Sequence, residues 1–372
     1  MIRYAYFLAG LIFLVLVGVK WDRSTGFTSL IRFGETWQDR RDPTLQNLPI
    51  ATVPKSNGYD GQFYAQLALD PLLRGPELER IIDAPAYRAH RILTPGIAAL
   101  LGLGHPWWVL HVYALLNVAA WLALACLLKT AIGGSDWPNF ARWVGCLFSM
   151  GALESVRQSL VDLPALLLLA LAVRSYTPPR TGKSTLWLAL GNLAKETTAI
   201  GTVALHSTDL FDKTRRSRAL GSIVLALLPL GIWWLYVSHR FTTASNDEAW
   251  GNFTWPFLAL LTQAKLNLLQ LFQGNFDGRY TFGLIAIVGL AIQATVLWRT
   301  PDFKSPWWRI GAAYSLVLPF LSLWVWSGYW AACRAALPLT IAFNLLLPVN
   351  RRFWPLWFAG NLTLLHAIWR FL

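Results

Sequence analysis

The feature that most constrains this chain is its series of apolar runs, which recur from residue 4 to residue 370. A helix needs roughly 20 predominantly apolar residues to cross a bilayer. Only 14% of the 372 residues are charged, whereas a soluble domain carries about 25%. The sequence therefore predicts an all-α, polytopic transmembrane protein that forms a single integral membrane domain over residues 1–372. The apolar stretches lie at 4–19, 92–103, 107–128, 141–153, 159–173, 185–194, 195–206, 219–238, 281–298, 308–326, 330–348 and 353–370.

The first apolar run is predicted to be a retained transmembrane helix rather than a signal peptide. It lies behind Arg3 and ends at Lys20. A signal peptide ends in small residues at its cleavage site, and the sequence Val-Gly-Val-Lys at 17–20 matches that pattern poorly.

Several later stretches are too short to cross a bilayer alone. The pairs 141–153 with 159–173, and 185–194 with 195–206, have the pattern of broken or short helices. Broken backbone at membrane depth is tolerated only where protein or a water-filled cavity surrounds it. A polar cavity is therefore expected beside these breaks.

Residues 21–91 form a long hydrophilic segment that contains nine of the 19 acidic residues and many prolines and glycines. Loops of this length in compact proteins tend to be functional. We expect 21–91 to be the first outer loop, carrying short helices. A second outer loop is expected at 239–280, with an amphipathic helix at 253–272 lying in the membrane interface.

The distribution of basic residues predicts the orientation of the chain. Positive residues collect in short cytoplasmic loops of membrane proteins. If all six basic segments face the cytoplasm, about 11 spans result, provided that 92–103 does not cross fully. The net charge of +13 is then explained by basic residues that orient the chain in the membrane, and no nucleic-acid partner is expected. The basic residues of these segments are Arg3, Lys129, Arg142, Arg174, Arg180, Lys183, Lys213, Arg215, Arg216, Arg218, Arg299, Lys304, Arg309, Arg351 and Arg352.

Charged residues also occur within the apolar context, near the predicted outer face. A charge at membrane depth costs about 2.5–3.5 kcal/mol and marks a candidate functional site. Glu154 and Arg157 are either part of such a site or an ion pair that holds helices together. Lys195 and Glu196 are adjacent on a helix and do not face each other, so each needs another partner. Arg334 lies a few residues inward from a short outer turn.

The outer loop adds further candidates. Asp60 precedes a predicted helix at 61–69, where it is either a helix cap or a functional carboxylate. Gln62 and Tyr64 follow it. Arg88 and Arg91 lie where the chain re-enters the membrane. They are either interfacial arginines whose heads reach water or a clamp for a lipid phosphate, because the guanidinium fork matches phosphate oxygens.

Three short motifs together resemble the GT-C glycosyltransferase superfamily of bacterial polytopic proteins. They are similar also to PIG-V-type mannosyltransferases, in which an Asp-Gly pair follows the first transmembrane helix. The resemblance covers residues 1–210, with a weaker match at 334–338. The motifs are Tyr59-Asp60-Gly61-Gln62-Phe63-Tyr64, then Tyr87-Arg88 with Arg91-Ile92-Leu93-Thr94-Pro95, then Leu193-Ala194-Lys195-Glu196-Thr197.

The resemblance implies a glycosyltransferase of the bacterial inner membrane with its active site facing the periplasm. Such an enzyme transfers a hexose or pentose from a polyprenyl-phosphate donor to a glycan, lipid or protein acceptor. By position Asp60 is the catalytic carboxylate, and because no second acid follows it, no metal is expected.

The residue types suggest the remaining roles. Asp60 would be the general base. Arginine and lysine side chains would stabilise the departing phosphate. A single base without a nucleophile favours inversion. The expected substrate and phosphate residues are Arg88, Arg91, Lys195, Glu196, Arg334, Gln62, Tyr64 and Arg157.

Two other functions remain open from the sequence. A transporter or flippase of lipid-linked sugars would place charged sites near the midplane between inverted repeats, and no clear repeat is present. A non-catalytic partner in envelope assembly is the third possibility. The three cysteines and six histidines lack metal-ligand spacing, and no phosphate-binding glycine loop is present, so no cofactor is expected.

Overall fold

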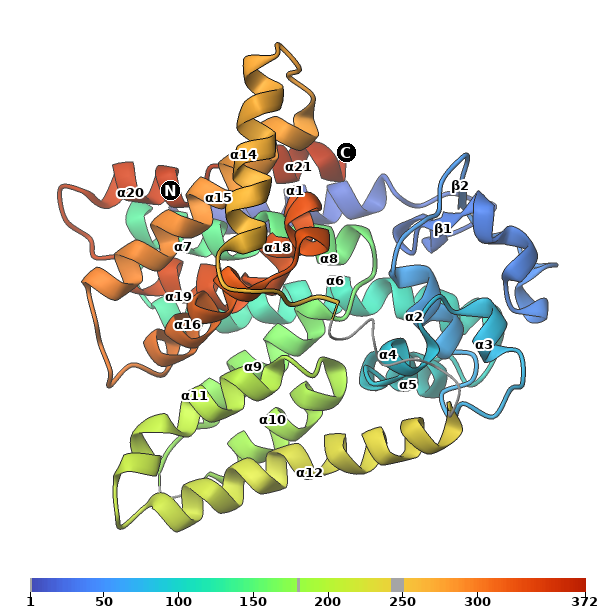
Figure 1. The fold of residues 1–372 in the computed structure, drawn as a ribbon, viewed down its shortest axis with the longest axis horizontal. Coiled ribbons are helices and arrows are strands. Elements are labelled where there is room, and N and C mark those ends of the chain that lie inside the picture. Colours follow the sequence, from blue (N-terminus) through green and yellow to red (C-terminus); the bar gives the residue numbers. More distant parts are fainter. Residues whose placement is uncertain (1, 179–180, 242–250) are drawn as a thin grey trace.

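The computed structural model describes residues 2–178, 181–241 and 251–372. About 71% of the residues are helical and 2% lie in strands, which confirms the predicted all-α class. Figure 1 shows the segment that contains α2, α3, α4 and the two strands at the right of the molecule, and α12 along the lower edge.

The helices outside the first loop are α1 (Ile2–Gly18), α5 (Leu93–Leu101), α6 (Pro106–Ile132), α7 (Trp137–Leu147), α8 (Met150–Arg157), α9 (Asp162–Ser175), α10 (Gly182–Ala194), α11 (Thr198–Phe211), α12 (Arg216–Arg240), α14 (Leu258–Phe272), α15 (Gly278–Arg299), α16 (Pro306–Val317), η4 (Leu318–Phe320), α17 (Leu323–Ser327), α18 (Tyr329–Ala335), α19 (Leu337–Leu346), α20 (Phe353–Gly360) and α21 (Leu364–Phe371).

Three helices are long and apolar enough to cross a membrane, counted over the described ranges: α6, α12 and α15. Helices α1 and α19 are apolar but shorter. Large apolar side chains of α12 are exposed along its length, and soluble monomers rarely expose a contiguous apolar surface of this extent. The chain is therefore a membrane protein. The exposed residues of α12 are Leu220, Val224, Leu225, Leu228, Ile232, Trp234, Leu235 and Tyr236.

Helix α6 is central to the packing and contacts α5, α7, α8 and α9. Its fully buried Trp121 stacks on Phe13 of α1, with ring centroids 3.7 Å apart. The indole of Trp121 also donates a hydrogen bond to the carbonyl of Leu147, at 2.8 Å. An indole N–H needs such a partner when it is buried, so this one side chain ties together α1, α6 and the end of α7.

The helix breaks are more numerous than the sequence predicted. The stretch 141–153 divides between α7 and α8, and 353–370 divides between α20 and α21. At the break between α8 and α9, Ser159 has φ 46° and its carbonyl accepts a hydrogen bond from the buried Tyr113 hydroxyl, at 2.8 Å. Buried backbone groups at a break must find such partners, and side chains of neighbouring helices provide them here.

A small polar cavity lies beside the break between α7 and α8. Its volume is about 20 Å³, and Ser149, Gln293, Thr340 and Asn361 contribute to its lining. This volume fits about one water molecule. The cavity expected beside a helix break is therefore present here only at the size of a single water.

Residues 21–91 carry short elements, as predicted. The two strands pair in parallel, with Phe33 opposite Thr52 and Gly34 opposite Val53. Helix α5, which follows, has nine residues and is about 13 Å long, too short to cross a hydrocarbon core of about 30 Å. The elements of the loop are η1 (Thr28–Leu30), β1 (Phe33–Gly34), η2 (Glu35–Arg40), η3 (Pro43–Leu45), β2 (Thr52–Val53), α2 (Gly61–Leu67), α3 (Leu78–Ile81) and α4 (Pro85–Ala89).

The predicted second outer loop contains a helix whose polar residues face the protein. Helix α14 packs on α15 and runs crosswise to α6 and α12 in Figure 1. Gln263 and Asn267 are buried, whereas Leu261 and Leu268 are exposed. The polar side chains bond to each other, at 2.8 Å, so the apolar face points away from the protein. Residues 242–250 of this loop lie outside the described residues.

Candidate functional site

The position of Asp60 depends on glycines before and after it. Gly58 has φ 69°, and a Cβ there would lie 2.4 Å from the backbone nitrogen of Gly34. A Cβ on Gly61 would lie 2.1 Å from the carbonyl oxygen of Gln158. Only glycine fits such close backbone contacts. The start of α2 is therefore pressed against the end of α8, which brings Asp60 to the break between α8 and α9.

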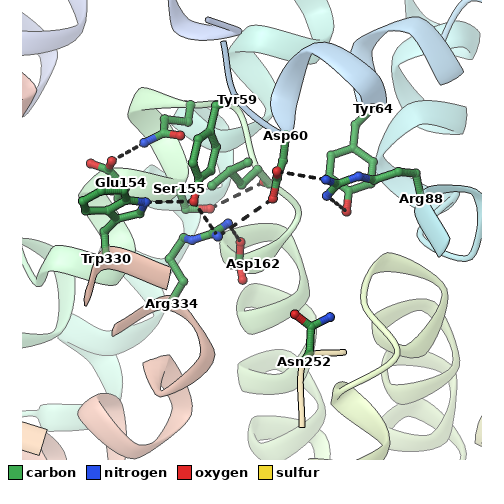
Figure 2. Close-up of polar contacts among 12 residues, drawn as sticks. Tyr59, Asp60, Tyr64, Arg88, Glu154, Ser155, Asp162, Asn252, Trp330 and Arg334 are labelled. Atoms are coloured by element: carbon green, nitrogen blue, oxygen red, sulfur yellow. Dashed lines mark hydrogen bonds and ion pairs between the residues drawn. The ribbon is translucent and has the colours of Figure 1, made fainter. Parts of the chain in front are cut away.

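Asp60 is the residue before α2, but its side chain makes no capping hydrogen bond. Its carboxylate instead pairs with Arg88, at 3.0 Å, and lies 4.0 Å from Arg334. Figure 2 shows Asp60 between these two arginines. The side chain is 28% exposed, so it is accessible without pointing into bulk solvent. Of the two interpretations of Asp60, the helix cap is not supported.

The neighbouring charges determine the protonation of Asp60. Burial favours the neutral form and would raise the pKa of Asp60. The positive charges of Arg88 and Arg334 more than offset this effect and hold the pKa below its ordinary value. Asp60 is therefore a carboxylate at neutral pH.

Arg91 and Glu196 form the second ion pair of the site although they are 105 residues apart. Two nitrogens of Arg91 approach the carboxylate, at 2.8 Å and 2.5 Å. The Tyr64 hydroxyl lies 2.5 Å from Arg91 and 3.5 Å from Arg88. Burial raises the pKa of Tyr64 to about 12, so this residue remains a neutral phenol. Tyr64 thus connects the two arginines.

Lys195 and Arg334 share a third carboxylate. Lys195 contacts Asp162 at 2.6 Å, and Arg334 contacts it at 3.1 Å. Lys195 and Glu196 lie in the break between α10 and α11 rather than within a helix, and they have separate partners. Because Arg334 also approaches Asp60, Asp162 links the outer loop, α9 and α18.

The eight residues joined in this way are called the Asp60 cluster. Seven of the nine site residues expected from sequence belong to this cluster. The cluster consists of Asp60, Tyr64, Arg88, Arg91, Asp162, Lys195, Glu196 and Arg334.

Two expected site residues lie elsewhere. Gln62 is fully buried and holds the outer loop together, since its side chain accepts from the Gly34 amide at 3.0 Å and donates to the Asn57 carbonyl at 2.7 Å. Arg157 pairs with Glu154, at 3.2 Å, in a neighbouring group. Gln62 therefore does not face the Asp60 cluster, and Arg157 belongs to a separate set of charges.

Other residues at the site were not predicted from sequence. Asp83 is a second partner of Arg88, at 2.8 Å. Tyr59 accepts hydrogen bonds from Trp330 and Arg334, at 2.9 Å and 3.0 Å, and Figure 2 shows it between Asp60 and Glu154. Tyr87 lies on α4, which ends at Ala89, and its hydroxyl is 2.5 Å from Arg91, four residues further along the chain.

Asn252 also approaches the site, from a distant part of the sequence. Its amide nitrogen lies 3.2 Å from the Tyr87 hydroxyl, and Figure 2 shows its side chain directed toward the region between Asp162 and Arg88. No spacing pattern connects residue 252 with residues 60–91, so this contact could not be predicted from the sequence.

Over the described ranges, no group of three or more histidine, cysteine, aspartate or glutamate side chains is arranged to hold an ion. The carboxylates of the Asp60 cluster are occupied by arginine and lysine instead.

Comparison with known proteins gives no independent indication of function. No family model, no curated protein and no solved structure matches this chain.

Proposed function

We propose that the chain is a membrane glycosyltransferase of the GT-C type that uses a polyprenyl-phosphate sugar donor. The observation that supports this most strongly is the meeting of Asp60 with Arg88, Arg91, Lys195 and Arg334. These residues come from three distant parts of the sequence, namely the 21–91 loop, the break between α10 and α11, and α18. An accessible carboxylate beside several cations suits a reaction in which a hydroxyl loses a proton and a phosphate departs.

In the proposed reaction, Asp60 takes the proton of the acceptor hydroxyl. The acceptor oxygen forms a bond to the anomeric carbon, and the bond from that carbon to the phosphate oxygen breaks. The phosphate leaves with the bonding electrons as polyprenyl phosphate, and the arginines stabilise its charge. One displacement inverts the anomeric configuration.

The ion pairs suggest how donor binding would activate Asp60. Without a substrate, Arg88 and Arg334 hold the pKa of Asp60 low, which makes it a weak base. A donor phosphate that pairs with Arg88 would neutralise part of this positive charge. The pKa of Asp60 would then rise, and its strength as a base would increase. Donor binding and base activation are thus coupled through one guanidinium.

The proposal includes the membrane arrangement. It places about 11 spans in the bacterial inner membrane, with the Asp60 cluster on the periplasmic side and the basic loops in the cytoplasm. The exposed apolar helices and the basic segments support this arrangement.

Proteoliposomes that contain the purified protein and a radiolabelled polyprenyl-phosphate hexose or pentose test the function. A transferase converts the donor to a glycosylated acceptor and free polyprenyl phosphate. Movement of the intact donor between leaflets, with no new glycosidic bond across a panel of sugars and acceptors, would instead show a flippase. Empty liposomes provide the control for both readouts.

A further inference from the structure

A second group of charges lies beside the Asp60 cluster and differs from it in balance. The Asp60 cluster has a carboxylate partner for each cation, since Arg88 also contacts Asp83. In the second group Glu154, which is 2% exposed, is the carboxylate. Arg157 contacts it at 3.2 Å and Arg370 at 2.7 Å. One negative charge is therefore shared by two guanidinium groups.

Arg32 and Lys20 add two more positive charges. Arg32 lies within electrostatic reach of both Glu154 and Arg370. Within the described ranges its side chain has no hydrogen bond and no ion pair. Lys20 donates to the backbone carbonyl of Leu372, at 2.8 Å. Burial first, and then the charges of Arg157 and Arg32, lower the pKa of Lys20. Two arginines thus contact Glu154 and Arg32 lies within electrostatic reach of it, which leaves an excess of positive charge. Lys20 lies within electrostatic reach of Arg157 and Arg32.

The backbone of Arg32 supports the same conclusion. Its φ is 59°, a left-handed conformation that costs a non-glycine residue roughly 1–2 kcal/mol. Strained residues of this kind concentrate at binding and active sites. The carbonyl of Arg32 accepts from the amide of Tyr59, at 3.1 Å. The strained residue therefore directly supports the residue before Asp60.

The surroundings indicate a lipid as the source of a compensating anion. Apolar side chains next to these cations are strongly exposed, including Val19 at 64%, Trp21 at 54% and Trp369 at 68%. Trp and aliphatic side chains beside cations are typical of the membrane–water boundary. Arg157 and Arg370 are themselves 18% and 20% exposed, so an anion can reach them.

We propose that Lys20, Arg32, Arg157 and Arg370 form a binding site for the phosphate of a lipid headgroup at the outer face, separate from the Asp60 cluster. Arginine binds phosphate through two parallel hydrogen bonds, and the unpaired Arg32 has its full set of donors available. Tyr59 lies between Glu154 and Asp60 in Figure 2, and Trp330 donates to its hydroxyl. The proposal does not depend on sugar transfer, because a headgroup can occupy the site whatever reaction Asp60 performs.

Binding to the detergent-purified, full-length protein tests this site. The probes are dihexanoyl phosphatidic acid, dihexanoylglycerol, which lacks the phosphate, and inorganic phosphate. The variants are R32Q and the double variant R32Q/R157Q. The matched control is R80Q, because Arg80 lies in the same loop but is 49% exposed and pairs with Glu77. R32K keeps the charge, and thermal unfolding confirms that each variant is folded.

Loss of one charged hydrogen-bond donor should weaken phosphatidic acid binding about tenfold in R32Q, and more in the double variant. R80Q should bind as the unchanged protein does, and R32K should retain most of the affinity. Equal affinity in R32Q/R157Q would overturn the site. Equal binding of dihexanoylglycerol would exclude phosphate recognition, and inorganic phosphate binding as tightly as phosphatidic acid would exclude the lipid. None of these results depends on transferase activity.

Discussion

At the scale of single residues, the notable feature is that every cation expected to bind phosphate already has a carboxylate partner. Arg88 lies between Asp60 and Asp83, and Arg91 lies against Glu196. A buried ion pair offsets much of the cost of removing both charges from water, and removal of one partner leaves the other uncompensated. A substrate must therefore exchange with these partners, which makes each pair sensitive to pH and to charge.

Arg88→Gln should shift the acidic limb of the transfer-rate profile to higher pH. Arg88 is the largest of the charges that lower the pKa of Asp60, so its loss raises that pKa and Asp60 takes up a proton at a higher pH. At donor concentrations well below KM, where the rate reports the free enzyme, the limb of the unchanged protein should lie below the ordinary carboxyl pKa of about 4. Initial rates from pH 3 to pH 8, with R80Q as the control, provide the measurement. An acidic limb at the same pH in both variants would contradict the coupling.

The same ion pair predicts how stability depends on pH. Because the folded pKa of Asp60 is lowered, its pairing stabilises the fold above the ordinary carboxyl pKa, and this contribution is lost as pH falls through the folded value. Thermal unfolding in detergent should show this loss in the unchanged protein, and Asp60→Asn should reduce it. An identical acid dependence in the two proteins would show that Asp60 has an ordinary environment.

The residue types of the site could be predicted from sequence, whereas their partners could not. Lys195 and Glu196 have the separate partners that the sequence predicted, but the premise that they lie on a helix was wrong, because both lie in the break between α10 and α11. Their actual partners, Asp162 and Arg91, depend on how distant segments pack. For Gln62 the predicted role was wrong. Its position near Asp60 suggested a substrate contact, but its side-chain amide forms hydrogen bonds within the loop.

At the scale of elements, short helices position the site. Helix α2 begins where Gly61 meets the last carbonyl of α8, so the register of α2 determines where Asp60 lies. The sequence predicted this helix at 61–69, and the structure places it at Gly61–Leu67. The additional helix breaks could not be predicted from the sequence, because proline, glycine and serine occur in both continuous and broken transmembrane helices. Tertiary contacts decide between the two.

Gly61→Ala should displace α2 and lower both stability and transfer activity. Its Cβ would lie 2.1 Å from a backbone oxygen, and overpacking of this kind typically costs about 1–3 kcal/mol. Gly96→Ala in α5 is the matched control, because no atom lies within 4 Å of its Cβ. That change should be neutral or stabilising by about 0.5–1 kcal/mol. Thermal unfolding of both variants is the measurement that compares them. Equal stability of the two variants would show that the close contact at Gly61 is absent.

At the scale of the whole molecule, composition and charge predicted the class but not the number of crossings. Three described helices are long enough to span, whereas the other apolar segments are divided into shorter helices that must pack end to end or side by side. Hydropathy cannot distinguish a broken span from two half-spans, since both have the same composition. The side on which each loop lies is therefore a matter for labelling experiments.

Cysteine labelling in intact cells should place the first loop outside and the basic loops inside. Cys126 is exposed and Cys146 and Cys333 are buried, so Cys126→Ser removes the accessible native thiol among them. In that background a membrane-impermeant maleimide should label Asp39→Cys directly. Lys213→Cys should react only after permeabilisation. Labelling of both positions from the same side of intact cells would contradict the proposed topology.

The central claim is that Asp60 is the base of a sugar transfer, and its isosteric replacement tests this most directly. Asp39 lies in the same outer loop and is exposed, so Asp39→Asn is the matched control for Asp60→Asn. In proteoliposomes supplied with a polyprenyl-phosphate sugar, we expect Asp60→Asn to lower the transfer rate by about 10²- to 10⁴-fold, while Asp39→Asn leaves it unchanged. Transfer by a folded Asp60→Asn protein at the rate of the control would contradict the account.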